Sequence, residues 1–231
     1  MKKIIISILL VISMCFPLTG CFNNPTEGCD GKEYPDFLDY YIHNDWGAFA
    51  KVEVSKLREG YYTEFDRGEE GGPRLLIAEC TVVKDYYGKL FSGTAVNVVI
   101  PIETKRNTDV ETIEAEIRSI FTESDHLLIG LDNYNSCFNY VHNGEQSVLD
   151  EESGGAYFVE FYDYKIIPIN DGALDVTRID DAIESLGATP SDQEKLWYPR
   201  YREEFDYFFP DGATDAELEV KLGELFYAMN K

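Results

Sequence analysis

The fold is decided by residues 96–131, VNVVIPIETKRNTDVETIEAEIRSIFTESDHLLIGL, which put a helix between two strands. Apolar residues alternate with other residues along 95–102, which predicts a strand with one buried face. From Val110 to Phe121 the apolar residues recur at helical spacing, and Thr108 with Glu111 predicts a capping box at the start of that helix. The apolar run 127–131 predicts the next strand.

Strands are also predicted on both sides of this segment. Residues 48–55 alternate between apolar and polar, and the run Leu75 to Val83 is almost continuously apolar, as in a central strand. A glycine-bearing loop, Gly60 to Pro73, separates these two strands. After the helix we expect further strands near Phe138 to Val141 and from Tyr157 to about Ile169.

Helical spacing is found at both ends of the chain. A short amphipathic helix with an aromatic face is predicted over residues 37–46. A longer helical region follows Asp175, where capping boxes that begin at Ser191 and Thr214 open two further helices. These helices carry too much apolar surface to be stable alone, so we expect residues 176–231 to pack on the sheet.

The order strand-strand-strand-helix-strand-strand is that of the OB-fold, a small Greek-key β-barrel. The sequence therefore predicts a single α+β domain over residues 35–231. In this domain an OB-like barrel (48–175) follows a short helix and is extended by C-terminal helices (176–231). The alternative is an open antiparallel sheet with a helix on one face.

The N-terminus contains a basic start, an apolar run from Ile4 to Phe16 and the tetrapeptide Leu18-Thr19-Gly20-Cys21. This arrangement resembles the lipobox of bacterial lipoproteins, in which the cysteine is acylated, with palmitate among the acyl groups, and the chain is cut before it. A retained membrane helix needs about 20 apolar residues, and this run is shorter. The resemblance implies a signal peptide over 1–20, a lipid on Cys21 and an extracytoplasmic location at the cell membrane.

Two further segments fit a surface lipoprotein. Residues 21–34 are rich in Asn, Pro, Gly and Thr, which predicts a flexible tether. Residues 87–98, YGKLFSGTAVNV, are similar to a segment of bacterial surface lipoproteins of uncharacterised function, where a tight turn leads into a strand of an OB-like barrel. The similarity covers roughly residues 74–175 and implies a fold, but it carries over no functional residue.

The charge of the chain narrows the class of partner. The sequence has 43 acidic and 20 basic residues, a formal net charge of −23, which becomes −25 when the two lysines of residues 1–20 are removed. Such a field repels phosphate backbones and anionic headgroups. We therefore expect no nucleic-acid binding and no membrane contact beyond the N-terminal lipid. The sequence leaves the oligomeric state open.

Catalytic and metal-binding motifs are not visible in the sequence. His43, His126 and His142 lack ligand spacing, and Cys29, Cys80 and Cys137 form no metal or redox motif. Cys80 is interpreted as a core residue, with a Cys80–Cys137 bridge as the alternative. Two acids within apolar runs, Glu79 and Glu160, are the candidates for a buried general acid. The sequence predicts no catalytic residue, no metal and no cofactor.

An acidic rim is the candidate binding surface. Ligands of OB-folds bind beside the loops that join strands one and two and strands four and five, here Gly60 to Pro73 and Asn143 to Gly155. The acidic residues of these loops are Glu64, Asp66, Glu69, Glu70, Glu145, Asp150, Glu151 and Glu152. If the two loops lie together, the rim favours a cation or a basic protein; the alternative is that the loops are simply solvated. The candidate exposed aromatic contacts are Tyr61, Tyr62, Trp197 and Tyr207.

The sequence thus favours a membrane-anchored, extracytoplasmic lipoprotein that acts as a non-catalytic binding or interaction module of the cell envelope. One alternative is an envelope hydrolase that acts on glycans through paired carboxylates. Another is a purely structural role in the envelope.

Overall fold

The computed structural model describes residues 48–63, 73–102, 108–131, 133–186, 202–203 and 205–229. The predicted signal peptide, Cys21, the tether and the first helix lie outside these residues. The capping box at Ser191 and the aromatic Trp197 also lie outside them.

The described residues form one sheet of ten strands. Its main path has the order β10-β9-β4-β1-β2-β3-β8-β5, and β6 and β7 branch from β1. Neighbouring strands are antiparallel, except that β3 and β8 are parallel. The strands are β1 (Ala48–Tyr62), β2 (Arg74–Asp85), β3 (Ala95–Ile102), β4 (His126–Leu131), β5 (Tyr134–Asn135), β6 (Cys137–His142), β7 (Glu145–Asp150), β8 (Ala156–Phe158), β9 (Ile166–Asn170) and β10 (Ala173–Leu174).

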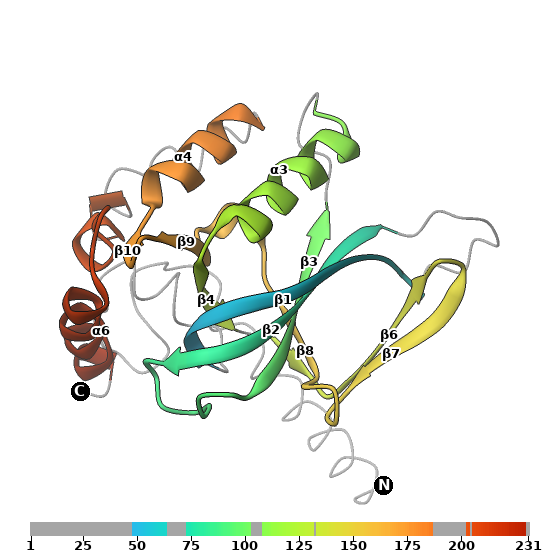
Figure 1. The fold of residues 1–231 in the computed structure, drawn as a ribbon, viewed down its shortest axis with the longest axis horizontal. Helices are drawn as coiled ribbons and strands as arrows, with labels where there is room; N and C mark the ends of the chain where they lie inside the picture. The colour runs from blue at the N-terminus through green and yellow to red at the C-terminus, as the bar shows by residue number, and fades with distance from the viewer. Residues whose placement is uncertain are drawn as a thin grey trace, which may run out of the picture.

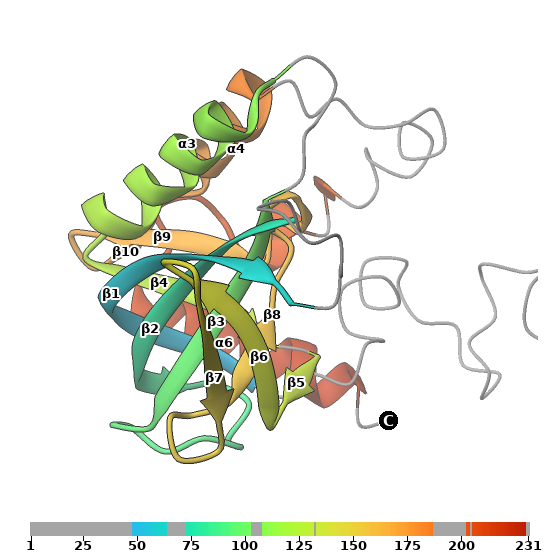
Figure 2. The ribbon, with the colours of Figure 1, turned by 90° about the vertical axis from the view of Figure 1, so that its right-hand side faces the viewer.

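Helices cover the sheet on two sides. Figures 1 and 2 show α3 (Val110–Glu123) and α4 (Val176–Ser185) side by side over one end of the sheet, and α6 (Asp215–Met229) on another side. A short 3-10 helix, η1 (Phe161–Asp163), lies between β8 and β9. In the part of the chain that the structure describes, no helix is both long and apolar enough to cross a membrane.

The central helix α3 packs through the predicted apolar stripe. Ile113, Ile117, Ile120 and Phe121 are all buried against the sheet. The predicted capping box is wrong, because Asp109 caps the helix by accepting a hydrogen bond from the Thr112 backbone N–H at 2.7 Å. The Thr108 hydroxyl instead donates to the Leu186 carbonyl at 2.9 Å and so joins the start of α3 to the end of α4.

The α+β class is observed, but the predicted OB-like barrel is wrong because the sheet is open. Its path ends at β10 on one side and at β5 on the other, and no described pairing joins these ends. The cause lies in β1, which is 15 residues long rather than the predicted eight. One edge of β1 pairs with β2, while the other pairs with β4 through 48–52 and with β6 through only Tyr61 and Tyr62. In a closed barrel each strand is paired on both edges with neighbouring strands. This edge of β1 is paired only near its two ends, with the short strands β4 and β6.

Two other predicted segments differ from the structure. The single strand expected from Tyr157 to Ile169 is two strands, β8 and β9, because η1 and the left-handed Tyr164 (φ 55°) turn the chain between them. The expected loop Asn143 to Gly155 contains β7, which forms a hairpin with β6. Asn143 (φ 52°) and Gly144 (φ 78°) form its two-residue turn, and this Asn-Gly pair is the signal that sequence reasoning missed.

The helix α6 is attached to the sheet by a charged contact. The buried Lys51 of β1 lies 2.9 Å from the Asp215 carboxylate, and the Tyr86 hydroxyl donates to the same group at 3.3 Å. At the start of the helix, the predicted capping pair forms: Glu217 accepts from the backbone N–H and the hydroxyl of Thr214. These contacts fix the C-terminal helix against the sheet.

The Asp215 contact predicts a pH-dependent stability. Burial alone would raise the pKa of this carboxyl group, but the hydrogen bond and charge of Lys51 outweigh it and lower the pKa. A carboxyl group with a lowered folded-state pKa stabilises the protein above its unfolded pKa, and the contribution is lost as the pH falls. We expect Asp215→Asn to lower the free energy of unfolding at pH 7 by up to about 1 kcal/mol, since the side chain is half-exposed. Near pH 3, below the unfolded-state pKa of 3.8, the difference should be smaller than at pH 7.

Urea denaturation at both pH values measures this difference. Asp181→Asn, which removes an exposed carboxylate of α4, is the matched control and should show little effect at either pH. An equal loss for Asp215→Asn at pH 7 and pH 3 would contradict the assignment.

Candidate functional site

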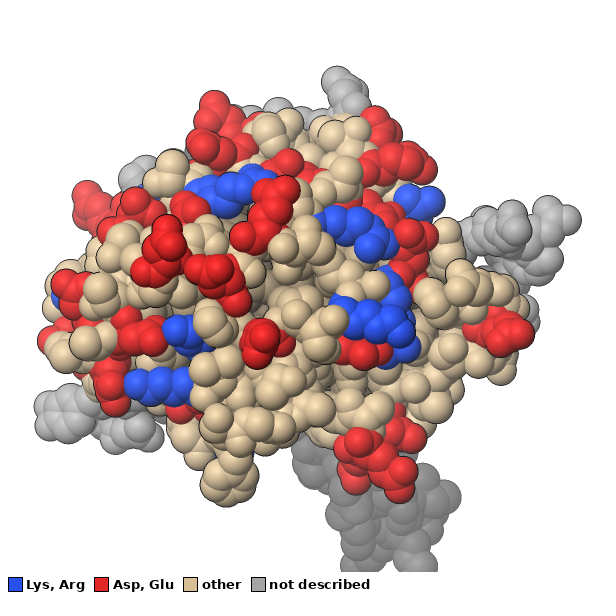
Figure 3. All heavy atoms as spheres, in the orientation of Figure 1, with Lys and Arg blue, Asp and Glu red and all other residues tan. Residues whose placement is uncertain are grey.

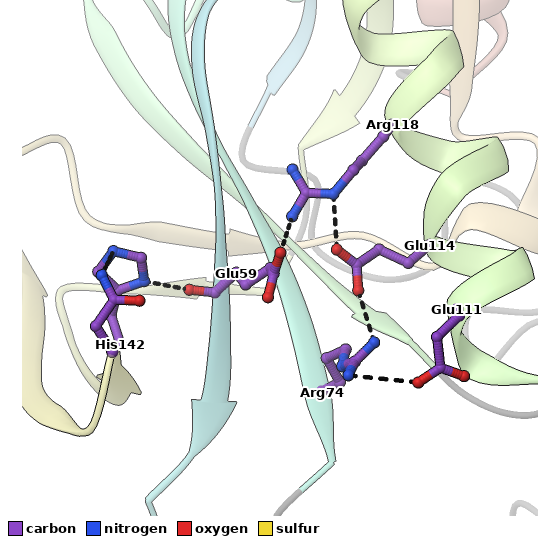
Figure 4. A network of polar contacts seen from close by, with 7 residues as sticks. Glu59, Arg74, Glu111, Glu114, Arg118 and His142 are labelled. Atoms are coloured by element: carbon purple, nitrogen blue, oxygen red, sulfur yellow. Dashed lines mark hydrogen bonds and ion pairs between the residues drawn. The ribbon is translucent and has the colours of Figure 1, made fainter.

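A network of ion pairs connects α3 to β1 and β2 (Figure 4). At its centre is Glu114, which is only 6% exposed; its two carboxylate oxygens accept from Arg74 at 3.0 Å and from Arg118 at 2.6 Å. Arg118 also pairs with Glu59 at 2.9 Å, and a ring nitrogen of His142 lies 2.6 Å from the Glu59 carbonyl oxygen. Each charged group at the centre of the network is paired with a group of opposite charge. The role of the network is therefore to hold α3 on the sheet.

The catalytic candidates lack the environment of a general acid. Glu160 is exposed, and Glu79 is partly exposed and ion-paired with Arg58. A general acid needs a buried carboxyl group with a raised pKa. Among the described residues, no three His, Cys, Asp or Glu side chains gather into a metal site.

The two described cysteines are not bridged. Cys80 is buried, as predicted, and Cys137 is exposed. Burial raises the pKa of the Cys80 thiol to about 12, so at neutral pH this residue is a protonated core side chain.

A cleft of about 310 Å³ opens beside the first residues of β3. Five parts of the chain form it: the connection between β2 and β3, the start of β3, the strand β5, the turn after β7 and the strand β8. Two of its lining residues are acidic and none is basic. The lining residues are Leu90, Thr94, Ala95, Val96, Tyr134, Glu151, Glu152, Gly154 and Tyr157.

The connection between β2 and β3 is held by one carboxylate. Asp85 accepts hydrogen bonds from the backbone N–H groups of Tyr87 at 2.9 Å and of Lys89 and Leu90, both at 2.7 Å. This fixes the loop that forms one wall of the cleft. Phe91, the next residue, is 84% exposed.

The turn after β7 is fixed on β3 by a buried amide. Asn97 is 3% exposed, and its side chain donates to the carbonyl groups of Ser153 at 2.7 Å and Gly155 at 2.8 Å. Gly154 (φ 96°) lies so close to β3 that a Cβ there would come within 2.4 Å of the Ala95 carbonyl oxygen. The carboxylates of the preceding Glu151 and Glu152 are therefore carried on a turn that cannot move far from β3.

An aromatic wall completes the cleft. The rings of Tyr134 and Tyr157 lie 4.9 Å apart and are tilted by 45°. Burial raises the pKa of Tyr157, and the nearby Tyr134 and Asp85 raise it further, so this phenol is neutral at physiological pH. The cleft thus combines two carboxylates with two tyrosine rings.

The structure brings together only part of the predicted acidic rim. Glu151 and Glu152 line the cleft, and Asp150 shapes the turn, where hydrogen bonds from Ser153 lower the pKa of its carboxyl group. Glu145 lies at the other end of β7, about 17 Å from Asp150 at ordinary strand spacing. Glu64, Asp66, Glu69 and Glu70 lie outside the described residues.

The described candidate aromatic contacts lie in different environments, away from the cleft. Tyr61 and Tyr62 belong to β1 and are half-buried, and Tyr62 packs against Phe138 and Phe158. Tyr207 is exposed, but Lys221 lies over its ring at 3.4 Å and its hydroxyl donates to Glu224 at 2.9 Å.

Sequence reasoning missed the tyrosines of the cleft, Tyr134 and Tyr157. It also missed Asn97, although a polar residue within an otherwise apolar strand is a visible signal. The pair Gly154-Gly155 after three consecutive acids is a second signal, because adjacent glycines indicate a close approach of two backbone segments.

No protein-family model matches this chain, and no curated protein and no solved structure is significantly similar to it. The assignment of the site therefore depends on its own geometry and chemistry.

The position of Gly154 predicts a measurable effect on stability. We expect Gly154→Ala to destabilise the protein by about 3 kcal/mol for two reasons. The new Cβ would clash with the Ala95 carbonyl oxygen, and alanine disfavours the positive φ of this position. Gly144→Ala is the matched control, since Gly144 also has a positive φ but has open space around it; its cost should be about 1 kcal/mol. Urea denaturation of both variants compares the two costs, and equal costs would show that the turn does not lie tightly on β3.

Proposed function

We propose that this chain is a lipid-anchored, extracytoplasmic binding module and that its cleft binds a cationic group. The observation that carries the proposal is the pairing of Glu151 and Glu152 with the rings of Tyr134 and Tyr157 in one cleft that no basic residue lines. Carboxylates attract a cation, and aromatic faces add a further attraction to it.

The kind of cation follows from the number of available oxygen atoms. Calcium takes six to eight oxygen ligands, and magnesium requires a nearly ideal octahedron. Two acidic side chains beside aromatic rings suit an organic ammonium or guanidinium group better, because such a group is satisfied by one or two carboxylates and a π face.

The charge of the whole molecule supports the same partner. On the face seen in Figure 3, acidic side chains are spread widely, and Lys and Arg side chains lie mostly beside them. A net charge of −23 raises the local concentration of cations around the protein and increases their rate of encounter with the cleft.

The anchor is tested in the native cell. If the lipobox functions, the mature protein is bound to the membrane through Cys21, and Cys21→Ala leaves either an uncleaved precursor or a released protein. Cell fractionation and the mass of the mature chain measure both outcomes. A Cys21→Ala protein that is cut and anchored as before would show that the lipoprotein assignment is wrong.

The cleft is tested with a small organic cation, Nα-acetyl-lysine methylamide, and its uncharged analogue Nα-acetyl-norleucine methylamide. We expect the lysine derivative to bind at millimolar concentration and to shift NMR signals of residues around Tyr134 and Glu151. The double variant Glu151→Gln, Glu152→Gln should bind it about five-fold more weakly, as expected for the loss of about 1 kcal/mol of charge interaction.

Glu145→Gln is the matched control for this titration, since Glu145 lies at the far end of β7, and it should leave the affinity unchanged. Equal shifts with the norleucine derivative, or shifts that survive in the double variant, would contradict a cation site in the cleft.

A further inference from the structure

The hairpin of β6 and β7 leaves one strand edge open. β6 pairs with β1 on one side and with β7 on the other, whereas β7 pairs only with β6 within the described residues. Figure 1 shows this hairpin projecting to one side of the sheet. The unpaired side of β7 is called the β7 edge below.

The hairpin register shows which backbone groups face the β7 edge. His142 and Glu145 flank a two-residue turn, so they form a hydrogen-bonded pair, and every second residue along the strand does the same. The backbone N–H and C=O groups of Gln146, Val148 and Asp150 therefore point away from β6. Those of Asp150 bond within the next turn, its N–H to the Ser153 hydroxyl and its carbonyl to the Gly155 N–H. Among the residues that the structure describes, the groups of Gln146 and Val148 have no partner, so they can pair with another strand.

The side chains of β7 suit an added strand. Leu149 is buried under the hairpin, while Gln146 and Val148 on the opposite face are exposed, Val148 by 46%. Proteins usually protect an open edge with lysine, proline or a bulge, and the sequence of β7, Glu-Gln-Ser-Val-Leu-Asp, contains neither of these residue types. The ladder with β6 is regular over all six residues, without a bulge.

The β7 edge leads directly into the cleft. Asp150 ends the strand, and the next two residues, Glu151 and Glu152, line the cleft. We propose that the β7 edge accepts an extended basic peptide as an additional strand and that one of its Lys or Arg side chains enters the cleft. This proposal rests on the cation site of the proposed function and specifies the ligand as a peptide segment.

Charge decides between a basic peptide and a second copy of this chain. Glu145 lies at one end of the edge and Asp150, Glu151 and Glu152 at the other. Two β7 edges paired with each other would bring these like charges together, which destabilises cross-strand pairs. A basic strand relieves the same repulsion, and its backbone supplies hydrogen bonds to Gln146 and Val148.

The test uses the synthetic peptide acetyl-Lys-Val-Lys-Val-Lys-Val-amide and a second version in which every peptide-bond nitrogen is methylated. Both versions carry the same charge, but the fully methylated one has no peptide-bond N–H group to donate along either of its edges. We expect the unmodified peptide to bind at least ten-fold more tightly by isothermal titration calorimetry. Equal affinities would show that the contact is only electrostatic and would overturn the added strand.

The variant Val148→Pro tests the same edge from the protein side. It removes an N–H group that faces away from β6, and edge strands tolerate proline at such positions. We expect at least a ten-fold loss in affinity for the peptide and no change for Nα-acetyl-lysine methylamide, which needs only the cleft. If Val148→Pro does not fold, the comparison of the two peptides decides the matter.

The remaining outcomes separate this inference from the proposed function. Binding of the lysine derivative with equal affinities for the two peptides would overturn the added strand and leave the cation site in place. A lysine derivative that does not bind would remove the cation site itself. Sedimentation that shows a dimer of the native protein, lost in Val148→Pro, would assign the β7 edge to a second copy and overturn the peptide proposal.

Discussion

The division of one edge of β1 between two neighbours is the constraint on which the rest of the fold depends. β1 keeps β2 on one side from Ala50 to Tyr61, while β4 and β6 share only the ends of its other side. The sheet therefore divides into two parts on this side of β1. β4 leads to β9, β10 and the helices, whereas β6 leads to a hairpin that stands apart from them (Figure 1). The β1–β2 ladder shifts register twice: at Lys51/Val52 the extra residue is Val83 of β2, and at Val54/Lys56 it is Ser55 of β1, which lies between the two parts.

Each part has its own apolar core. The larger core joins the sheet to α3, α4 and α6, and its centre includes Phe49, Phe121 and Phe205. A smaller cluster lies under the hairpin, where Phe138, Tyr140 and Leu149 cover Leu75 and Ile77 of β2. This second core holds the hairpin in place by its inner face alone, so the outer strand needs no further neighbour to be stable. An open edge beside a cleft is a consequence of that arrangement.

Local patterns in the sequence predicted the elements better than they predicted the topology. The stripe from Ile113 to Phe121, the alternation in 95–102 and the run at 75–83 each identified an element correctly, because burial on one face imposes a period that a single segment displays. Closure of the sheet was predicted wrongly, since it depends on which strands share the edge of β1, and no single segment encodes that. The missed strand β7 is polar and half-exposed, so its period is weak; only the Asn143-Gly144 turn indicated it.

The candidate site was predictable to a similar degree. Glu151 and Glu152 were selected because they are acidic residues in a region expected to be a loop, and the structure does put them in a cleft. The tyrosines that face them could not be selected, since Tyr134 and Tyr157 reach the cleft through the pairing of β5 with β8, a contact between segments about 20 residues apart. The buried amide of Asn97 holds the acidic turn on β3 and so determines where the carboxylates of Glu151 and Glu152 lie. In the proposed binding mode, the acidic residues at the ends of β7 disfavour pairing with another copy of the chain and favour a basic strand. In that proposal, one set of charges both selects the partner and disfavours self-association.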